Sequence, residues 1–140
     1  MFKGINTTVF AYGMTGSGKT FTLQGGIGKN AGMIPRTIEY IFKNKPKNHQ
    51  IFISFLEIYN EKVFDLLSKT PTRDLQIRED GSNNVFIQGL TESPIKAPFE
   101  FTLLYENGLK KRTTAFTDLN HSSSRSHAVI IIKVYFLIIK

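Results

Sequence analysis

One short stretch of the chain, GMTGSGKT from Gly13 to Thr20, has the residue types and spacing of a phosphate-binding loop. Glycines at positions 13, 16 and 18 allow backbone N–H groups to turn inward around an anion without Cβ clashes. Lys19 would place a positive charge between the β- and γ-phosphates, and the Thr20 hydroxyl is suited to Mg²⁺. The pattern predicts a loop that binds a nucleoside triphosphate; the alternative is a glycine-rich turn beside a surface lysine.

A second polar cluster, TDLNHSSSRSHAV from Thr117 to Val129, contains four serines, two histidines, an asparagine and an arginine. Hydroxyls gathered in this way can ligate Mg²⁺, hydrogen-bond a γ-phosphate or hold a water. Read alone, the segment is equally consistent with a polar loop or a phosphorylation site. A Ser/His/Asp triad is disfavoured because the sequence has no nucleophile-elbow motif.

The elements that must position these residues follow from the apolar pattern. The run TTVFAY (7–12) before the glycine loop predicts a buried strand, and KTFTL (19–23) after it opens a helix. Further along, we expect a helix in 34–45, a strand in 50–60, a hairpin from LQIRE and VFIQG, a helix in 98–108 and a strand in 127–139. The last strand is apolar at nearly every position and should be covered on both faces. The alternation of strands and helices indicates an α/β layered domain.

Composition narrows the class of protein. The chain has 140 residues, of which 41% are hydrophobic, and the length suits one domain. It contains no cysteine, which excludes disulfides and thiolate metal sites. No segment resembles a signal peptide, and the C-terminal apolar run, interrupted by Lys133, is too short to span a membrane. A reduced, cytosolic or nuclear setting is the default expectation.

The formal net charge of +7 favours an acidic partner. Nucleic acid, an anionic membrane, an acidic protein surface or a polyphosphate ligand would each fit. The charges are dispersed, and the only run of three basic residues ends at Arg112. Such a run indicates a solvated face, with a localisation signal or a phosphate patch as alternatives.

Several segments together resemble the kinesin motor domain, in the order and at about the spacing of that family. They are NTTVFAYGMTGSGKTFTLQG, GMIPRTIEYIF, SFLEIYNEKVFDLL, LQIRED with VFIQGLTE, and RTTAFTDLNHSSSRSHAVI. The resemblance runs from about Gly4 to Val134, and the patterns AYGxTGSGKT and NxxSSRSH are highly specific. The segments IREDGSNNVFIQGL and SRSHAVIIIKV are most similar to chromosome-associated kinesins of the Kid type.

The resemblance implies an α/β fold of the P-loop NTPase type, in which helices flank a central, mostly parallel β-sheet. Residues 1–140 then form a partial motor domain, with the P-loop at 13–20 and switch I at about 117–127. Strands that precede Met1 in the family, the DLAGSE segment of switch II and the neck are absent from this sequence. We therefore expect a sheet that is incomplete at both ends and exposes strand edges and apolar faces.

The resemblance also implies roles for individual residues. The nucleotide-binding residues would be Gly13, Met14, Thr15, Gly16, Ser17, Gly18, Lys19, Thr20 and Phe21, with Phe21 beside the adenine. In switch I, Asn120 would brace the γ-phosphate, Ser123 would help position the attacking water, Ser124 would approach Mg²⁺ and Arg125 would pair with a switch II glutamate. Thr20 and Ser124 would be the Mg²⁺ ligands. Met14 replaces the family's common glutamine at a position that acts through its backbone N–H.

The function implied by the resemblance is that of the ATP-binding part of a microtubule-stimulated ATPase motor, with ATP and Mg²⁺ as ligands. The expected partner is the microtubule, with chromosome or DNA association as a further hypothesis and no membrane. The expected location is the cytoplasm and the microtubule cytoskeleton or spindle, with a nuclear or chromosomal location as an alternative. A truncated product that binds nucleotide weakly or acts only as an interaction fragment is the competing interpretation. A different P-loop NTPase, such as a nucleotide kinase or a nucleic-acid translocase, would lack the serines of switch I.

Overall fold

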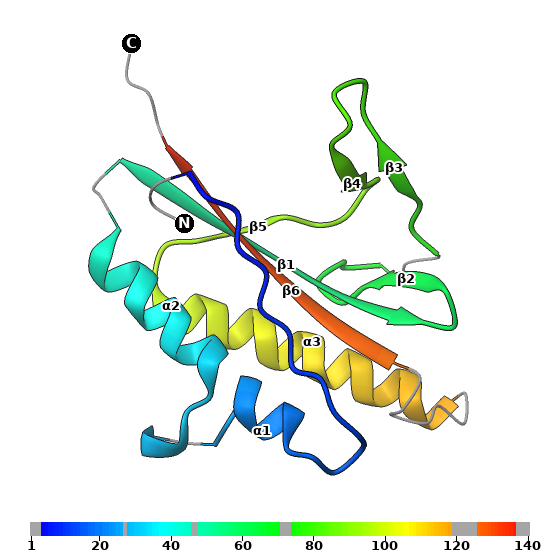
Figure 1. Ribbon diagram of the computed structural model, residues 1–140, viewed down its shortest axis with the longest axis horizontal. Helices are drawn as coiled ribbons and strands as arrows, with labels where there is room; N and C mark the ends of the chain where they lie inside the picture. The colour runs from blue at the N-terminus through cyan, green and yellow to red at the C-terminus, as the bar shows by residue number, and fades with distance from the viewer. Residues whose placement is uncertain (1–3, 27, 46–47, 71–73, 119–125, 137–140) are drawn as a thin grey trace.

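The computed structural model describes residues 4–26, 28–45, 48–70, 74–118 and 126–136. In chain order the elements are α1 (Lys19–Leu23), a 3-10 turn (Gly28–Asn30), α2 (Met33–Asn44), β1 (His49–Tyr59), β2 (Lys62–Asp65), β3 (Ile77–Glu79), β4 (Val85–Ile87), β5 (Ser93–Ile95), α3 (Pro98–Asp118) and β6 (Ser126–Phe136). Helices and a sheet are combined in one layered arrangement, so the α/β class is confirmed (Figure 1).

Strand β1 is the centre of the larger sheet. It pairs with β2 and β5 along one edge and with β6 along the other. The β1–β6 ladder extends from the pair His49–Phe136 to the pair Tyr59–Ser126. The sheet therefore joins the start of β6, which lies within the second polar cluster, directly to the end of β1.

The expected mostly parallel sheet needs correction, because every ladder between described strands is antiparallel. The turn at Asn60 and Glu61, both with positive φ, reverses the chain between β1 and β2 and so forces that pair to be antiparallel. Strands β5 and β6 run in the same direction on opposite edges of β1, and α3 makes the long crossover between them. The α/β character thus lies in this crossover, and not in adjacent parallel pairs.

The core lies between one face of the sheet and the helices α2 and α3. Ile38 and Ile41 of α2 are buried there, one turn apart on the apolar face of the helix. Ile51 and Ile53 alternate along β1 and face the same core, together with Phe101 of α3. The predicted helix in 34–45 and strand in 50–60 are confirmed, with boundaries shifted by a residue.

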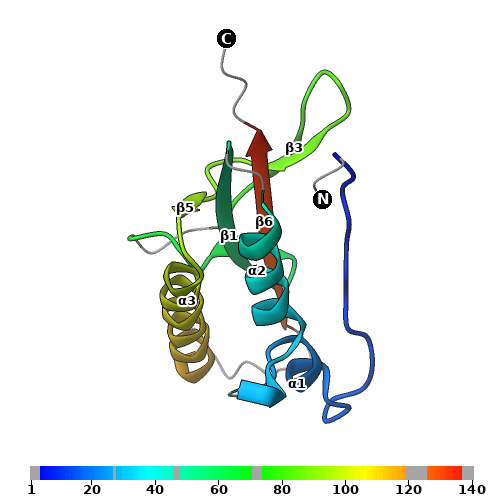
Figure 2. The ribbon, with the colours of Figure 1, turned by 90° about the vertical axis from the view of Figure 1, so that its left-hand side faces the viewer.

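The prediction of a buried strand in TTVFAY is wrong. Residues 5–13 form neither a helix nor a strand, and they make no ladder with any described strand. Phe10 is 80% exposed and Tyr12 is 94% exposed. Figure 2 shows this segment running apart from the sheet. β-Branched and aromatic residues favour a strand, but a strand forms only where a neighbouring edge accepts its hydrogen bonds.

Helix α3 begins at Pro98 as expected but continues past Gly108, the residue predicted to end it, as far as Asp118. Gly108 is buried, and a Cβ at this position would lie 2.4 Å from Cδ1 of Phe55. The glycine therefore serves the close approach of α3 to β1 and does not mark a helix end.

The predicted hairpin is confirmed as the β3–β4 pair, which forms a small separate sheet. Its turn is organised by Asp80, whose Oδ1 accepts hydrogen bonds from the backbone N–H groups of Ser82 (2.8 Å) and Asn84 (2.9 Å). The Asn84 side chain also donates to both carboxylate oxygens. These hydrogen bonds, that of the Asn84 side chain first, lower the pKa of Asp80.

Among the helices of the described ranges, none has both the length and the apolar composition that a membrane span needs. The longest described helix, α3, carries several charged side chains along its length.

Candidate nucleotide-binding site

The glycine loop is held in backbone conformations that favour glycine. Gly16 has φ 84° and Gly18 has φ 86°, both in the left-handed region. Nothing lies within 4 Å of the Cβ position at either residue, so the loop is open on that side. At Gly13 a Cβ would lie 2.6 Å from Oγ of Ser17, which means that the loop closes tightly on itself. Successive residues in such conformations present backbone N–H groups to an anion.

Lys19 is the first residue of α1, and its side chain turns back over the loop. Its Nζ donates hydrogen bonds to the carbonyl oxygens of Gly13 and Met14, both at 2.7 Å. The ammonium group therefore lies at the mouth of the loop, where a phosphate group would exchange for the two carbonyl contacts. A cationic group beside a glycine-rich turn that leads into a helix fits a polyphosphate.

The remaining predicted nucleotide-binding residues share this segment and its exposure. They are Met14, Thr15, Ser17, Thr20 and Phe21, all exposed to solvent. The Ser17 N–H donates to the Met14 carbonyl at 3.2 Å, which closes the turn before α1. Helix α1 was predicted and is confirmed, but it has only five residues. The predicted ligands are thus presented by a local turn with little packing around it.

The predicted switch I residues Asn120, Ser123, Ser124 and Arg125 lie outside the described residues. The structure describes the two ends of the segment that carries them, Asp118 at the end of α3 and Ser126 at the start of β6. Figures 1 and 2 place both ends at the same end of the molecule as the glycine loop. The expected contact between the glycine loop and switch I stays a prediction.

A group of three polar side chains, two of them buried, lies where β6 begins, and the sequence analysis did not single it out. We call Glu57, Arg112 and Ser126 the Glu57 network. Nε of Arg112 donates to Oε1 of Glu57 at 3.1 Å, and Nη2 of Arg112 donates to Oγ of Ser126 at 3.1 Å. The Ser126 hydroxyl in turn donates to Oε1 of Glu57. A glutamate inside the apolar run SFLEIY was the available signal, because a charged residue inside a buried strand needs partners.

The burial of the network is uneven. Glu57 and Ser126 are buried, and the Arg112 side chain keeps 24% of its surface exposed. Tyr105 lies about two turns before Arg112 on α3. Burial raises the pKa of Tyr105, and the positive charge of Arg112 opposes that rise. The network therefore links α3, β1 and β6 through charge-assisted hydrogen bonds that are largely shielded from water.

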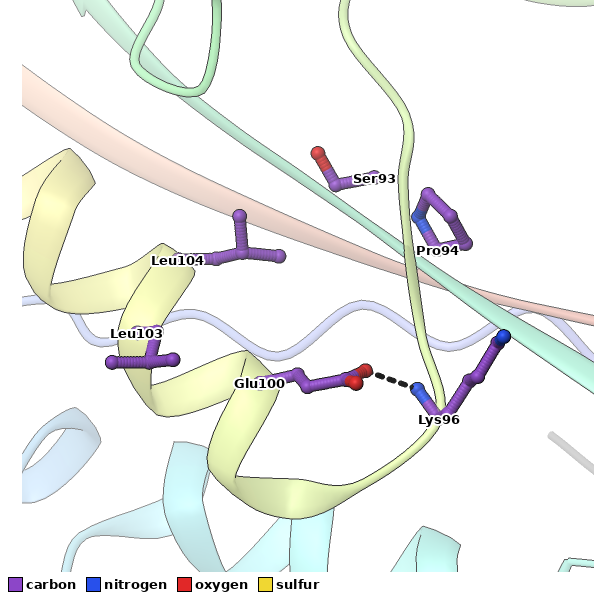
Figure 3. A pocket seen from close by; sticks show the side chains of 6 residues that line it. All are labelled: Ser93, Pro94, Lys96, Glu100, Leu103 and Leu104. Carbon is purple, nitrogen blue, oxygen red and sulfur yellow. Dashed lines mark hydrogen bonds between the residues drawn. The ribbon is translucent and has the colours of Figure 1, made fainter.

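An open groove of about 350 Å³ lies elsewhere, between β5 and the first turns of α3. Ser93, Pro94, Lys96, Glu100, Leu103 and Leu104 line it (Figure 3). The Glu100 carboxylate in this groove accepts a hydrogen bond from the backbone N–H of Lys96 at 2.6 Å. This hydrogen bond caps the start of α3. No residue of the glycine loop lines this groove, which is therefore separate from the candidate site.

Comparison with known proteins points to one family. The family model described as the kinesin motor domain matches residues 1–137. The chain is 44% identical over 142 residues to kinesin-like protein KIF22 of Danio rerio, covering 96% of this chain and 22% of the relative. It is 40% identical over 146 residues to the chromosome-associated kinesin KIF4 of Xenopus laevis, covering 96% of this chain and 12% of that relative.

One solved structure is also similar to this chain in its fold. It is described as the structure of a fast kinesin, with implications for the ATPase mechanism and interactions with microtubules. The two structures superpose with a TM-score of 0.87 at 36% identity, over 95% of this chain and 40% of that one. The chain thus spans about a fifth of the length of the first curated relatives. This chain belongs to the kinesin motor domain family.

Proposed function

We propose that this chain is the ATP-binding part of a microtubule motor and that its glycine loop holds the triphosphate. In the complete protein, ATP hydrolysis would be coupled to movement along microtubules. The single observation that supports this most strongly is the loop geometry, with left-handed glycines at 16 and 18 and the Lys19 ammonium at the mouth. Family membership supports the choice of ATP and of the microtubule.

In this proposal the loop N–H groups and Lys19 bind the β- and γ-phosphates, and Phe21 packs beside the adenine. The exposed Phe21 ring is free to make that contact. The hydroxyls of Thr20 and Ser124 would hold Mg²⁺, which supplies positive charge to the phosphate oxygens when bound. Each hydroxyl is a hard oxygen ligand of the kind that this ion prefers.

The switch I residues complete the proposed site. Asn120 braces the γ-phosphate, Ser123 orients the attacking water and Arg125 pairs with a carboxylate of switch II. Their role is polar positioning, which is most of what phosphoryl transfer requires from a protein. Support for this part comes from the motif and from the end of α3 and the start of β6, which lie toward the same end of the molecule as α1.

The proposed microtubule contact includes the β3–β4 hairpin. Ile77, Val85 and Phe86 are exposed on it, and Arg78 contributes a positive charge beside the carboxylates of Glu79 and Asp80. A basic chain of net charge +7 suits an acidic tubulin surface. Substitution of Arg78 by Glu is expected to lower cosedimentation with microtubules, whereas Lys43→Glu on helix α2 serves as a charge-matched control.

The proposed location is the microtubule cytoskeleton. A chromosomal location of the full-length protein is a second hypothesis, motivated by the similarity to a chromosome-associated kinesin. Light microscopy of the tagged full-length protein through mitosis would distinguish spindle fibres from chromosome arms.

The experiment that tests the proposed function is a pair of lysine substitutions. Lys19→Ala should abolish nucleotide binding by this chain and microtubule-stimulated ATP turnover by the complete motor, because the phosphate charge loses its main partner. Lys29→Ala, in the exposed loop before α2, should leave both unchanged. Unchanged turnover in the Lys19 variant would refute the assignment of the phosphate site.

A further inference from the structure

We propose that Asp65 is a positioning residue that orients the β3–β4 hairpin for its contact with the microtubule. Asp65 is the last residue of β2 and is buried, so it would act through the hairpin and not by touching the partner. The inference rests on the proposed function, because the contact of the hairpin with the microtubule is part of that proposal.

The hairpin stands apart from the larger sheet. Strands β3 and β4 pair with each other, and neither forms a ladder with another described strand. All of their residues except Ile87 are exposed. Figure 1 shows the hairpin projecting away from the larger sheet. Its orientation is therefore set by the chain that leads from β2 to β3 and by the chain that leads from β4 to β5.

The Asp65 carboxylate binds both of these connections. Its Oδ1 accepts hydrogen bonds from the backbone N–H groups of Leu67 at 2.8 Å and Ser68 at 3.1 Å, where the chain leaves β2. Its Oδ2 accepts a hydrogen bond from the backbone N–H of Thr91 at 2.8 Å, where the chain returns toward β5. One buried, charged acceptor thus joins the two connections, and hydrogen bonds to a charged acceptor are the stronger kind.

Val63, two residues before Asp65 on β2, adds a second point of attachment. Its backbone N–H donates to Oδ1 of Asp74 at 2.9 Å, and its carbonyl oxygen accepts from the backbone N–H of Leu75 at 2.8 Å. Leu75 lies two residues before β3, so this attachment is close to the base of the hairpin. Strand β2 therefore holds the chain on both sides of the hairpin, through Val63 before it and Asp65 after it.

The functional consequence concerns orientation more than folding of the hairpin. The turn of the hairpin is organised locally by Asp80, so the hairpin should keep its own structure when Asp65 is replaced. Its angle to the rest of the domain would then vary. A segment that must be ordered on binding lowers the affinity, because the ordering costs free energy. Loss of the Asp65 carboxylate should therefore weaken microtubule binding.

Nucleotide binding should not change with it. Figure 1 shows α1, which follows the glycine loop, at the opposite end of the molecule from the hairpin. The Lys19 ammonium at that loop donates to the carbonyl oxygens of Gly13 and Met14, whereas Asp65 accepts from Leu67, Ser68 and Thr91. The two sets of hydrogen bonds share no residue.

The test compares the unmodified 140-residue chain with Asp65→Asn. Asparagine keeps one acceptor oxygen but turns an NH₂ group toward the N–H groups of one connection, so that connection loses its hydrogen bond. Cosedimentation with paclitaxel-stabilised microtubules, with ADP and Mg²⁺ present, should show roughly tenfold weaker binding. ADP affinity measured by calorimetry should stay within about twofold, as expected for an independent site.

A second comparison separates a positioning role from a general effect. Arg78→Glu and Phe86→Ala together remove proposed contact groups from the hairpin. In a chain that already carries both substitutions, the orientation of the hairpin matters less. Adding Asp65→Asn to that chain should therefore lower microtubule affinity by less than about twofold.

Glu57→Gln is the matched control. It also converts a buried carboxylate to an amide, but its partners are Arg112 on α3 and Ser126 on β6. Thermal melts should show that it lowers stability, as Asp65→Asn does. Its microtubule affinity should stay within about twofold of that of the unmodified chain, because the hairpin keeps both attachments.

An affinity that is unchanged in Asp65→Asn, or that falls equally in Glu57→Gln, would overturn the inference. An undiminished effect of Asp65→Asn in the chain without the contact groups would overturn it as well. If Asp65→Asn gives no cooperative melt, Asp74→Ala, at an exposed position, takes its place. Weaker microtubule binding by Asp74→Ala would support the inference, and unchanged binding would overturn it.

The proposed function fails in a different way. Microtubule binding that is absent in the unmodified chain, or unchanged by Arg78→Glu with Phe86→Ala, would contradict the proposed contact of the hairpin itself, and the inference with it.

Discussion

The glycine loop and the Glu57 network represent opposite ways of arranging polar groups. The loop is made from consecutive residues, its chemistry is mostly backbone, and nearly all of it is exposed. The network is made from side chains separated by 55 and 14 positions, and two of its members are buried. One region depends on local backbone conformation, whereas the other depends on the packing of the whole domain.

Because of this difference, substitutions in the two regions should affect different quantities, namely ligand affinity in the loop and the free energy of unfolding in the network. A change in the loop alters a surface turn with few contacts, so it should affect binding far more than folding. A change in or beside the network disturbs the contact of α3 with the sheet and should act first on the free energy of unfolding. The following substitutions test that division.

The largest expected effect is at Gly108, where α3 approaches β1. Gly→Ala normally stabilises a helix, but a Cβ here would lie 2.4 Å from Cδ1 of Phe55. Gly108→Ala is expected to lower the free energy of unfolding by about 2–3 kcal/mol, measured by urea denaturation. Gly81→Ala, which has open space at its Cβ position, should change it little. Stabilisation by Gly108→Ala would show that α3 does not pack closely against Phe55 at this position.

The next effect is at Glu57. Glu57→Ala leaves Ser126 buried without its acceptor and removes the charge partner of Arg112. We expect a loss of about 2 kcal/mol in urea denaturation, a moderate figure because Arg112 is partly exposed and can be solvated. Glu39→Ala, at an exposed site on α2, should stay within about 0.5 kcal/mol of the unmodified chain. Equal effects from the two substitutions would contradict the network.

In the glycine loop, Gly18→Ala tests whether nucleotide binding depends on the backbone conformation of the loop. Gly18 has φ 86°, and Gly28 has φ 65°, with open space around both Cβ positions. Each alanine substitution should cost about 1 kcal/mol of stability for the same reason. Only Gly18→Ala should also weaken nucleotide binding, by at least about tenfold in a calorimetric titration. Loss of binding in both variants would show that affinity simply follows stability.

The smallest expected effect is at the β3–β4 turn and depends on pH. Because the pKa of Asp80 is lower in the folded hairpin than in the unfolded chain, its stabilising contribution is complete above the ordinary aspartate range. It is lost as the pH falls below about 4 and through the lowered folded value. The amide NMR signals of Ser82 and Asn84 should then move toward random-coil positions. Asp80→Ala should remove this pH dependence.

The sequence allowed the local features to be predicted. The glycine loop, α1, the helix in 34–45, the strand in 50–60 and the hairpin all follow from short-range patterns of glycine, proline and apolar residues. These patterns report the conformation that each segment prefers, and in these segments the preference agrees with the packing.

Features that depend on distant partners were missed. TTVFAY has the composition of a strand, yet no described edge accepts it, and the apolar side chains of Phe10 and Tyr12 stay exposed. Gly108 was read as a helix end because composition does not reveal that Phe55 lies against it. The Glu57 network was missed for the same reason, since its members meet only after β1, α3 and β6 have packed.

The most direct test of the central claim is an NMR titration of the 140-residue chain with ATP and Mg²⁺. The account predicts that the largest amide shifts occur at Gly16, Gly18 and Lys19, where the loop N–H groups would meet the phosphates. Shifts concentrated around Ser93 and Leu104, in the groove between β5 and α3, or no shifts at saturating ATP, would contradict it.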